Sequence, residues 1–276
     1  MDILKAVDIE TRYDNHSVFT QLNLRIPEGK VTTLIGPNGC GKSTLLKTMG
    51  RILKHTYGQV YLQSKELHTL PTKQVAQMLS LLPQQPEAPG ELTVEELVSY
   101  GRYPHRKNMN KLTRKDKEVI EWAMNITRIH TFRNRKLATL SGGQGQKVWL
   151  AMALAQETKI LLLDEPTTYL DMAHQLEVLE IIKHLNEAHH CTVVMVLHDI
   201  NQAARFSHEI VAMKNGEIIT TGTPKEIIHS EVLEKVFHIH ARTMIDPYNG
   251  APVCFGYESA LQENTSETDI EKESIK

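Results

Sequence analysis

The glycine-rich segment GPNGCGKST, residues 36–44, has the residue types and spacing of a phosphate-binding loop. It matches G-x-x-x-x-G-K-[ST] in full, follows an apolar run and precedes the helix-like TLLKTMG. We expect its backbone N–H groups and the following helix start to surround the β- and γ-phosphates of a nucleotide. Lys42 would add a positive charge there, and the Ser43 hydroxyl would hold Mg²⁺. The candidate residues are Gly36, Pro37, Asn38, Gly39, Cys40, Gly41, Lys42, Ser43 and Thr44.

Two acidic residues end a second apolar run, ILLLDEP at 160–166. Asp164 is placed to hold Mg²⁺ through water, and Glu165 to orient or deprotonate an attacking water. Two acids after four apolar residues are costly to bury without a cation. The pair therefore predicts a metal-assisted hydrolytic site at the end of this run.

Polar side chains also follow two further apolar runs. His198, in VLHDI, could sense or stabilise the γ-phosphate as charge spreads over its oxygens. Gln84, in LLPQQ, could contact Mg²⁺ and the attacking water through its amide, and Gln85 is a competing candidate for that role.

These residues need a scaffold that brings the ends of several strands together. The runs at 30–36, 159–165 and 192–198 are continuously apolar, which favours a parallel sheet covered on both faces. Helix-length segments alternate with them, so an α/β core is expected. Two short strands flank Asn215-Gly216 within 209–222, which predicts an antiparallel hairpin with a type I′ turn.

Strand signals are missing from residues 89–140, which we interpret as an inserted helical subdomain. Thr93–Glu96 and Thr113–Asp116 have the pattern of capping boxes. The second helix is expected to bury a face made of Val119, Trp122, Ala123 and Ile126. Residues 1–88 and 141–258 would form the core, and the polar residues 259–276 a disordered acidic tail.

Composition limits the classes of function. The 276 residues carry a net charge of −2, and this lack of basic bias counts against a nucleic-acid partner. The cysteines are far apart, which suits a reducing compartment. The longest apolar runs fall short of the roughly 20 residues that span a bilayer. We therefore expect a soluble chain that reaches a membrane only through a partner.

Taken together, these segments resemble an ATP-binding cassette, the nucleotide-binding subunit of an ABC transporter. The order matches over nearly the whole chain: an aromatic at Tyr13, the phosphate loop, LPQ, LSGGQ at 140–144, LLLDEP, TYLD ending at Asp171, and LHD. The resemblance implies a P-loop NTPase fold with a parallel sheet core, antiparallel β elements and an inserted helical subdomain. It also implies ATP and Mg²⁺ as cofactors.

The resemblance further implies a head-to-tail dimer of two copies. The LSGGQ segment of one chain would cover the nucleotide held by the phosphate loop of the other, with Tyr13 stacked on adenine. Small residues at a helix start suit an anion because their amides lie at its positive end. The implied contacts are Ser141, Gly142, Gly143, Gln144 and Asp171. Gly145 departs from the arginine usual after this segment, which predicts a slower or looser ATPase.

Several longer sequence segments are similar to the ATPases of iron–siderophore importers of the ferric hydroxamate and ferric citrate branch. The similar segments are ELVSYGRYPHR, LAMALAQ, DEPTTYLDMAHQLEVL and LHDINQAARF. This implies transmembrane permease subunits as partners, an extracellular siderophore-binding lipoprotein as an indirect one, and a peripheral place on the cytoplasmic face of the membrane. Residues 100–105 are either a permease-docking patch or a packing turn. Importers of heme, cobalamin or other metal chelates remain alternatives, as does a soluble ABC ATPase acting on ribosomes or DNA.

The histidines, including His238 and His240, are expected to lie at the surface without binding a metal.

Overall fold

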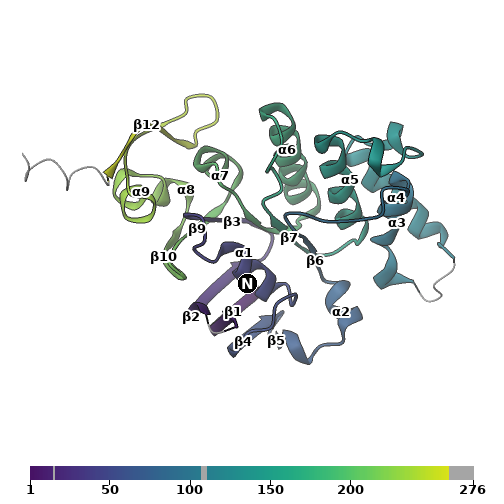
Figure 1. The fold of residues 1–276 in the computed structure, drawn as a ribbon, viewed down its shortest axis with the longest axis horizontal. Helices are drawn as coiled ribbons and strands as arrows, with labels where there is room; N and C mark the ends of the chain where they lie inside the picture. The colour runs from purple at the N-terminus through teal and green to yellow at the C-terminus, as the bar shows by residue number, and fades with distance from the viewer. Residues whose placement is uncertain (15, 107–110, 261–276) are drawn as a thin grey trace, which may run out of the picture.

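The computed structural model describes residues 1–14, 16–106 and 111–260. A six-stranded sheet runs through the middle of the molecule, with the strand order β10-β9-β3-β8-β7-β6 (Figure 1). Its strands are β3 (Val31–Ile35), β6 (Leu79–Leu82), β7 (Ile160–Asp164), β8 (Thr192–Val196), β9 (Glu209–Lys214) and β10 (Glu217–Gly222). The pairs β6·β7, β7·β8, β3·β8 and β3·β9 are parallel. The predicted parallel α/β core is thus confirmed.

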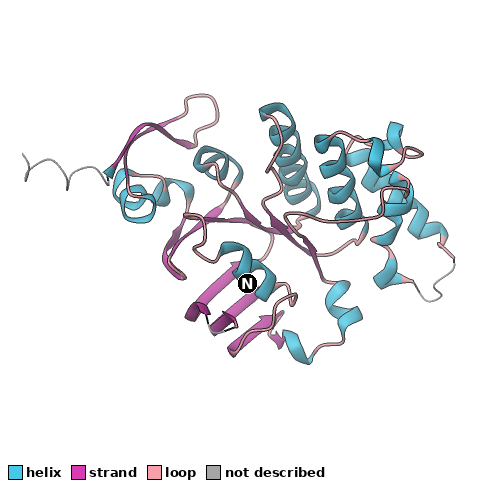
Figure 2. Ribbon diagram, viewed as in Figure 1, coloured by secondary structure: helices cyan, strands magenta, loops and turns pink. Residues whose placement is uncertain are grey.

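Layers of structure cover both faces of this sheet (Figure 2). One face packs on α1 (Lys42–Met49), beyond which lies a smaller antiparallel sheet. That sheet has the order β2-β1-β4-β5, with β1 (Asp2–Tyr13), β2 (His16–Pro27), β4 (Tyr57–Leu62) and β5 (Lys65–Glu66). The other face packs on α5 (Gly142–Ala155), α6 (Met172–His189) and α7 (Ile200–Phe206). Every residue of β3, β7 and β8 is buried, which explains their continuously apolar sequences.

The hairpin predicted at Asn215-Gly216 joins β9 to β10. Both turn residues have positive φ, 50° and 79°, as a type I′ turn requires. Short elements complete the core: η1 (Leu67–Thr69), α2 (Thr72–Ala76), α8 (Pro224–Ile227) and α9 (Ser230–Phe237). A last hairpin pairs β11 (Ile239–Ile245) with β12 (Pro252–Ser259). Ser259 therefore belongs to a strand, and residues 261–276 of the predicted tail lie outside the described residues.

Helices also fill the segment proposed as an inserted subdomain. They are α3 (Val94–Tyr100), η2 (Tyr103–His105), α4 (Arg114–Ile126), η3 (His130–Phe132) and η4 (Leu137–Thr139). Both capping boxes form, at Thr93–Glu96 and at Thr113–Asp116. The boundaries at 89 and 140 remain our proposal. None of the helices within residues 1–14, 16–106 and 111–260 is long and apolar enough to span a bilayer.

The buried face of α4 differs from the predicted one. Ile120, Ala123 and Met124 are buried, whereas Val119 and Trp122 are only half-buried and line a cavity of about 640 Å³. The helix packs against both α3 and α5, and this contact rotates its buried face by roughly one residue.

Candidate active site

A cavity of about 560 Å³ lies where β3, β7 and β8 end. The carboxyl ends of neighbouring parallel strands meet at one edge of a sheet, so residues distant in sequence converge there. The cavity brings together part of the phosphate loop, Glu165 and His198. Its lining is Tyr13, His16, Ser17, Val18, Asn38, Gly39, Gly41, Lys42, Ser43, Thr44, Glu165, His198, Asn215 and Gly216. Five other candidates are not in its lining within the described residues: Gly36, Pro37, Cys40, Gln84 and Asp164.

The phosphate loop leads from β3 into α1 through glycines in conformations that other residues rarely adopt. Gly36 has φ 151°, and a Cβ there would lie 2.1 Å from the carbonyl oxygen of Met213. Gly41, with φ 99°, is the N-cap of α1. Lys42 is buried, and its Nζ donates to the carbonyl oxygens of Gly36 at 2.8 Å and Pro37 at 2.9 Å. These glycines therefore place Lys42 at the start of the helix, inside the cavity.

The first carboxylate of the site is linked to the phosphate loop. Ser43 Oγ donates to Asp164 Oδ1 at 2.6 Å. Asp164 Oδ2 is buried and has no hydrogen-bond partner among the described residues. Lys47 Nζ lies 3.7 Å from this oxygen. Lys47 therefore supplies charge but no hydrogen bond to this buried oxygen, which still lacks a close partner. The oxygens of Ser43 and Asp164 are ligands of the kind that a hard divalent ion prefers.

The second carboxylate, Glu165, is held from three sides. His198 Nε2 lies 2.7 Å from Oε1, while Gln84 Nε2 donates to Oε2 at 2.5 Å and Thr168 Oγ1 donates to it at 2.9 Å. Glu165 itself has φ 51°, a left-handed conformation that is uncommon outside glycine and is often found at functional sites. Gln85, the competing glutamine, is exposed. The geometry therefore joins Gln84 and His198 around one carboxylate.

Thr168 cannot be identified from the sequence, because DEPTT offers two threonines and nothing local distinguishes them. The sequence also predicts the turn at Asn215-Gly216 but does not show that it lines the cavity. Gly216 N donates to Cys40 O at 3.2 Å, and a Cβ at Gly216 would lie 2.1 Å from Val18 O. This close approach places the hairpin against β2 in the wall of the cavity, whose lining also includes Tyr13, 48% exposed.

The LSGGQ segment lies at the start of α5, as expected. Ser141 Oγ accepts from Gln144 N at 3.3 Å, and Gln144 Oε1 accepts from Ser141 N at 3.2 Å. Ser141, Gly142, Gly143 and Gln144 are not in the lining of the 560 Å³ cavity within the described part of this chain. Neither is Asp171, whose Oδ1 caps α6 by accepting from His174 N at 2.9 Å. Contact of these residues with a nucleotide remains a prediction.

The segment 100–105 divides into two kinds of residue. Tyr100 and Tyr103 are exposed, but Arg102 is only 1% exposed and His105 Nε2 lies 2.7 Å from Gln156 O. The packing interpretation therefore applies to Arg102 and His105. Elsewhere, residues 1–14, 16–106 and 111–260 contain no group of three His, Cys, Asp or Glu residues that could hold a metal ion.

Comparisons with known proteins identify the family. Residues 19–168 match the model of the ABC transporter family. The chain is 49% identical to the iron(3+)-hydroxamate import ATP-binding protein FhuC of Bacillus subtilis, over 94% of this chain and 96% of that protein. It is 41% identical to the ferric enterobactin transport ATP-binding protein FepC of Escherichia coli, over 91% and 92%.

Solved structures agree with this assignment. A putative metal-chelate type ABC transporter in an inward-facing conformation has a TM-score of 0.79 and 27% identity, covering 92% of this chain and 96% of that one. The dimeric bacterial ABC transporter cassette MJ0796 has a TM-score of 0.71 and 30% identity, covering 80% and 98%. The chain therefore belongs to the ABC transporter family, as one of its ATP-binding, ATP-hydrolysing subunits.

Proposed function

We propose that this chain energises the uptake of iron(III)–siderophore complexes through a membrane permease by hydrolysing ATP. The observation that carries the hydrolytic part is the Glu165 carboxylate, held by Gln84, Thr168 and His198 beside the phosphate loop. The cargo is inferred from the relatives, which are named for iron–hydroxamate and ferric enterobactin transport.

In this proposal the phosphate loop binds the β- and γ-phosphates through backbone N–H groups, and Lys42 exchanges its carbonyl contacts for phosphate oxygens. Mg²⁺ would be held by Ser43, Asp164 and Gln84, since Asp164 Oδ2 is buried without a donor. When bound, Mg²⁺ neutralises charge on the phosphates. Tyr13 is half-exposed at the edge of the cavity, where its ring can stack on adenine.

Glu165 would orient and deprotonate the attacking water. Its three contacts fix the carboxylate, so little reorganisation is needed when the water binds. His198, on the outer side of this carboxylate, would stabilise charge on the γ-phosphate. Gln84 keeps its amide oxygen for Mg²⁺ or the water while its N–H₂ group holds Glu165.

A second copy of the chain would complete the site. Ser141, Gly142, Gly143 and Gln144 of one copy would cover the nucleotide held by the other, with Asp171 at the same interface. The support is that none of these residues is in the lining of the 560 Å³ cavity within the described part of the chain, and that a 30% identical cassette is dimeric. Tyr169 and Met172 are 82% and 76% exposed on either side of Asp171, as expected for residues that a partner covers.

The permease would bind the helical region, where Tyr100 and Tyr103 are exposed. The chain would then be peripheral on the cytoplasmic face of the membrane, and an extracellular siderophore-binding lipoprotein would deliver the cargo to the permease. The alternatives are a permease for heme, cobalamin or another metal chelate, and a soluble ABC ATPase acting on ribosomes or nucleic acid.

The test is transport by the reconstituted complex. A pull-down of the tagged chain from native membranes identifies the permease. Vesicles containing both, with the binding lipoprotein outside, are loaded with ATP and given radiolabelled iron–siderophore complexes, heme or cobalamin, one compound at a time. ATP-dependent accumulation of an iron–siderophore, absent with Glu165→Gln, supports the proposal. Accumulation of heme or cobalamin instead would reassign the cargo, and capture of ribosomes in place of a permease would overturn a transport role.

A further inference from the structure

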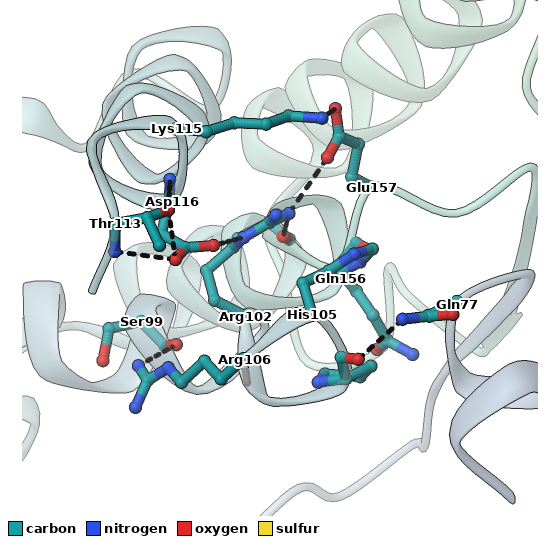
Figure 3. A network of polar contacts seen from close by, with 12 residues as sticks. Gln77, Ser99, Arg102, His105, Arg106, Thr113, Lys115, Asp116, Gln156 and Glu157 are labelled. Atoms are coloured by element: carbon teal, nitrogen blue, oxygen red, sulfur yellow. Dashed lines mark hydrogen bonds and ion pairs between the residues drawn. The ribbon is translucent and has the colours of Figure 1, made fainter. Parts of the chain in front are cut away.

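The buried side chain of Arg102 lies in the helical region, within a network of polar contacts (Figure 3). Neither Arg102 nor its partners are in the lining of the 560 Å³ cavity. The guanidinium of Arg102 donates from Nε to Asp116 Oδ1 at 2.8 Å, and from Nη1 to Ala155 O at 2.8 Å and to Glu157 Oε2 at 3.2 Å. These partners belong to α4, to the end of α5 and to the turn after α5. A buried ion pair is a poor route to stability, because well-packed apolar residues usually serve as well or better. The distinctive effect of this ion pair is geometric. The planar guanidinium of Arg102 bonds to three elements at once and so fixes their positions relative to one another.

The residues after Arg102 form the η2 turn and attach it to the core. His105 Nε2 lies 2.7 Å from Gln156 O, and Gln77 Nε2 donates to Pro104 O at 2.8 Å (Figure 3). Gln156 Nε2 in turn donates to Ala76 O at 2.7 Å. The η2 turn is therefore bound both to the end of α5 and to α2, which leads into β6.

Gly101 shows how closely the turn and α5 approach. A Cβ at this position would lie 2.2 Å from Met152 O and 3.0 Å from the Cβ of Ala155. The backbone before Arg102 therefore lies directly against α5, and any displacement of the turn must move the helix as well.

The opposite side of this turn is exposed and aromatic. The rings of Tyr100 and Tyr103 lie 5.3 Å apart, and the guanidinium of Arg106 lies 4.7 Å from the centre of the Tyr103 ring. The two tyrosines are 37% and 45% exposed. Aromatic residues beside an arginine are the composition that protein interfaces favour.

Both core elements bound to the turn lead to residues of the proposed ATP site. α5 is a 14-residue helix, so it carries the displacement over about 21 Å to its N-cap, Ser141. β6 ends at Leu82, two residues before Gln84. A movement of the η2 turn can therefore reach Ser141 through a rigid helix and Gln84 through a short strand.

We propose that Arg102 is a positioning residue that couples the Tyr100–Tyr103 surface, bound by the permease, to Ser141 and Gln84 at the ATP site. The inference rests on the proposed function, because it takes a permease as the partner of that surface. Arg102 touches neither nucleotide nor permease in this arrangement. It makes the turn, α4 and the end of α5 move as one body.

The experiment compares Arg102→Lys with a matched control, Arg133→Lys, in the permease complex. Lysine keeps the charge at position 102 but can reach only one of the three partners. Arg133 also pairs with carboxylates of the helical region, Glu95 and Glu121, but its side chain is a third exposed. Within residues 1–14, 16–106 and 111–260 it makes no hydrogen bond or ion pair to α5. For each variant we measure ATP affinity, hydrolysis by the full chain alone, affinity for the permease, and hydrolysis and transport by the complex.

Arg102→Lys is expected to keep ATP affinity, unstimulated hydrolysis and permease affinity near the wild-type values. The stimulation of hydrolysis by the permease should fall by about twofold to thirtyfold, with a parallel loss of transport. Arg133→Lys should retain the stimulation. Full stimulation of Arg102→Lys would overturn the inference, and so would a loss of unstimulated hydrolysis in the same proportion, since that indicates a merely structural role.

Gln77→Ala keeps the inference testable if Arg102→Lys does not fold. This variant removes one exposed contact to Pro104 and should fold as the wild type does. It is expected to lower the stimulation by about twofold or more, and unchanged stimulation would overturn the inference. A wild-type chain that binds no permease, or is not stimulated by one, would instead refute the proposed function and the inference with it.

Discussion

The carboxylate of Asp116 both caps α4 and pairs with Arg102. Its replacement by asparagine therefore tests these two contacts together. Oδ2 accepts from Thr113 N at 2.9 Å and from Thr113 Oγ1 at 2.7 Å, which caps α4. Oδ1 accepts from Arg102 Nε at 2.8 Å. Burial by itself would raise the pKa of Asp116, but the hydrogen bonds from Thr113 and Arg102 outweigh it and hold the pKa at about 2.

The lowered pKa of Asp116 indicates how much unfolding free energy the variant Asp116→Asn should lose. A lowering from the ordinary value of 3.8 to about 2 corresponds to roughly 2–3 kcal/mol of folding free energy, at about 1.4 kcal/mol for each pKa unit. Asparagine has only one side-chain acceptor oxygen, so it can serve Thr113 or Arg102 but not both. Breaking a buried ion pair by removing one partner costs about 3–5 kcal/mol. Asp116→Asn should therefore destabilise the protein by about 2–5 kcal/mol near neutral pH.

The sign of the pH dependence follows from the direction of the shift. Because the pKa is lower in the folded state, the stabilisation is complete above the ordinary pKa and is lost as the pH falls from about 4 towards 2. The gap in unfolding free energy between wild type and Asp116→Asn should thus narrow in acid.

Urea denaturation, followed by fluorescence at a series of pH values from neutral to acid, measures this gap. Glu96→Gln is the matched control, because Glu96 holds the same position in the capping box of α3. Its carboxylate is exposed and, among the described residues, accepts hydrogen bonds from Thr93 alone. The control should lose far less stability. Equal stability of Asp116→Asn and wild type at neutral pH, or a gap that does not change with acid, would refute the assignment of Asp116 as the counter-ion of Arg102.

Three further variants test the proposed ATP site and the helix that follows LSGGQ. Glu165→Gln should lower hydrolysis by about 100-fold or more while ATP binding persists, with a dimer retained in ATP on size exclusion; undiminished phosphate release would reject Glu165 as the base. Lys42→Ala should weaken ATP binding by about tenfold or more in calorimetry, because a charge-assisted contact is lost; an unchanged dissociation constant would contradict the phosphate loop. Gly145→Ala should raise the unfolding free energy by about 0.5–1 kcal/mol, since a Cβ there meets no atom of the described residues within 4 Å. Lower stability of this variant would mean that the glycine is needed for packing.

The sequence predicted those parts of the fold that depend on short stretches of chain. The phosphate loop, the buried strands β3, β7 and β8, the turn at Asn215-Gly216 and the capping boxes each have a local physical cause. The clustering of Glu165 with His198 could be predicted as well. Parallel strands that carry polar residues at their carboxyl ends must bring those residues to one edge of the sheet.

Features that depend on contacts between distant segments could not be predicted in this way. Nothing in the segment 100–105 marks Arg102 as buried, because its partners Asp116 and Glu157 come from other elements. Asp116 was recognised only for its local role in the capping box. The rotated face of α4 has the same origin, since a helix that packs on two neighbours has no single stripe that sequence periodicity can locate.

The two serines of the proposed ATP site use their hydroxyl groups in opposite ways: Ser43 donates a hydrogen bond within the chain, and Ser141 accepts one. Ser43 donates its proton to Asp164 Oδ1, so the lone pairs of its hydroxyl oxygen remain for a cation. Ser141 accepts from the backbone N–H of Gln144, so its own proton remains for an anion. The first arrangement suits Mg²⁺ and the second suits a γ-phosphate. In the proposed head-to-tail dimer, Ser43 of one copy and Ser141 of the other would supply these two capacities to one nucleotide.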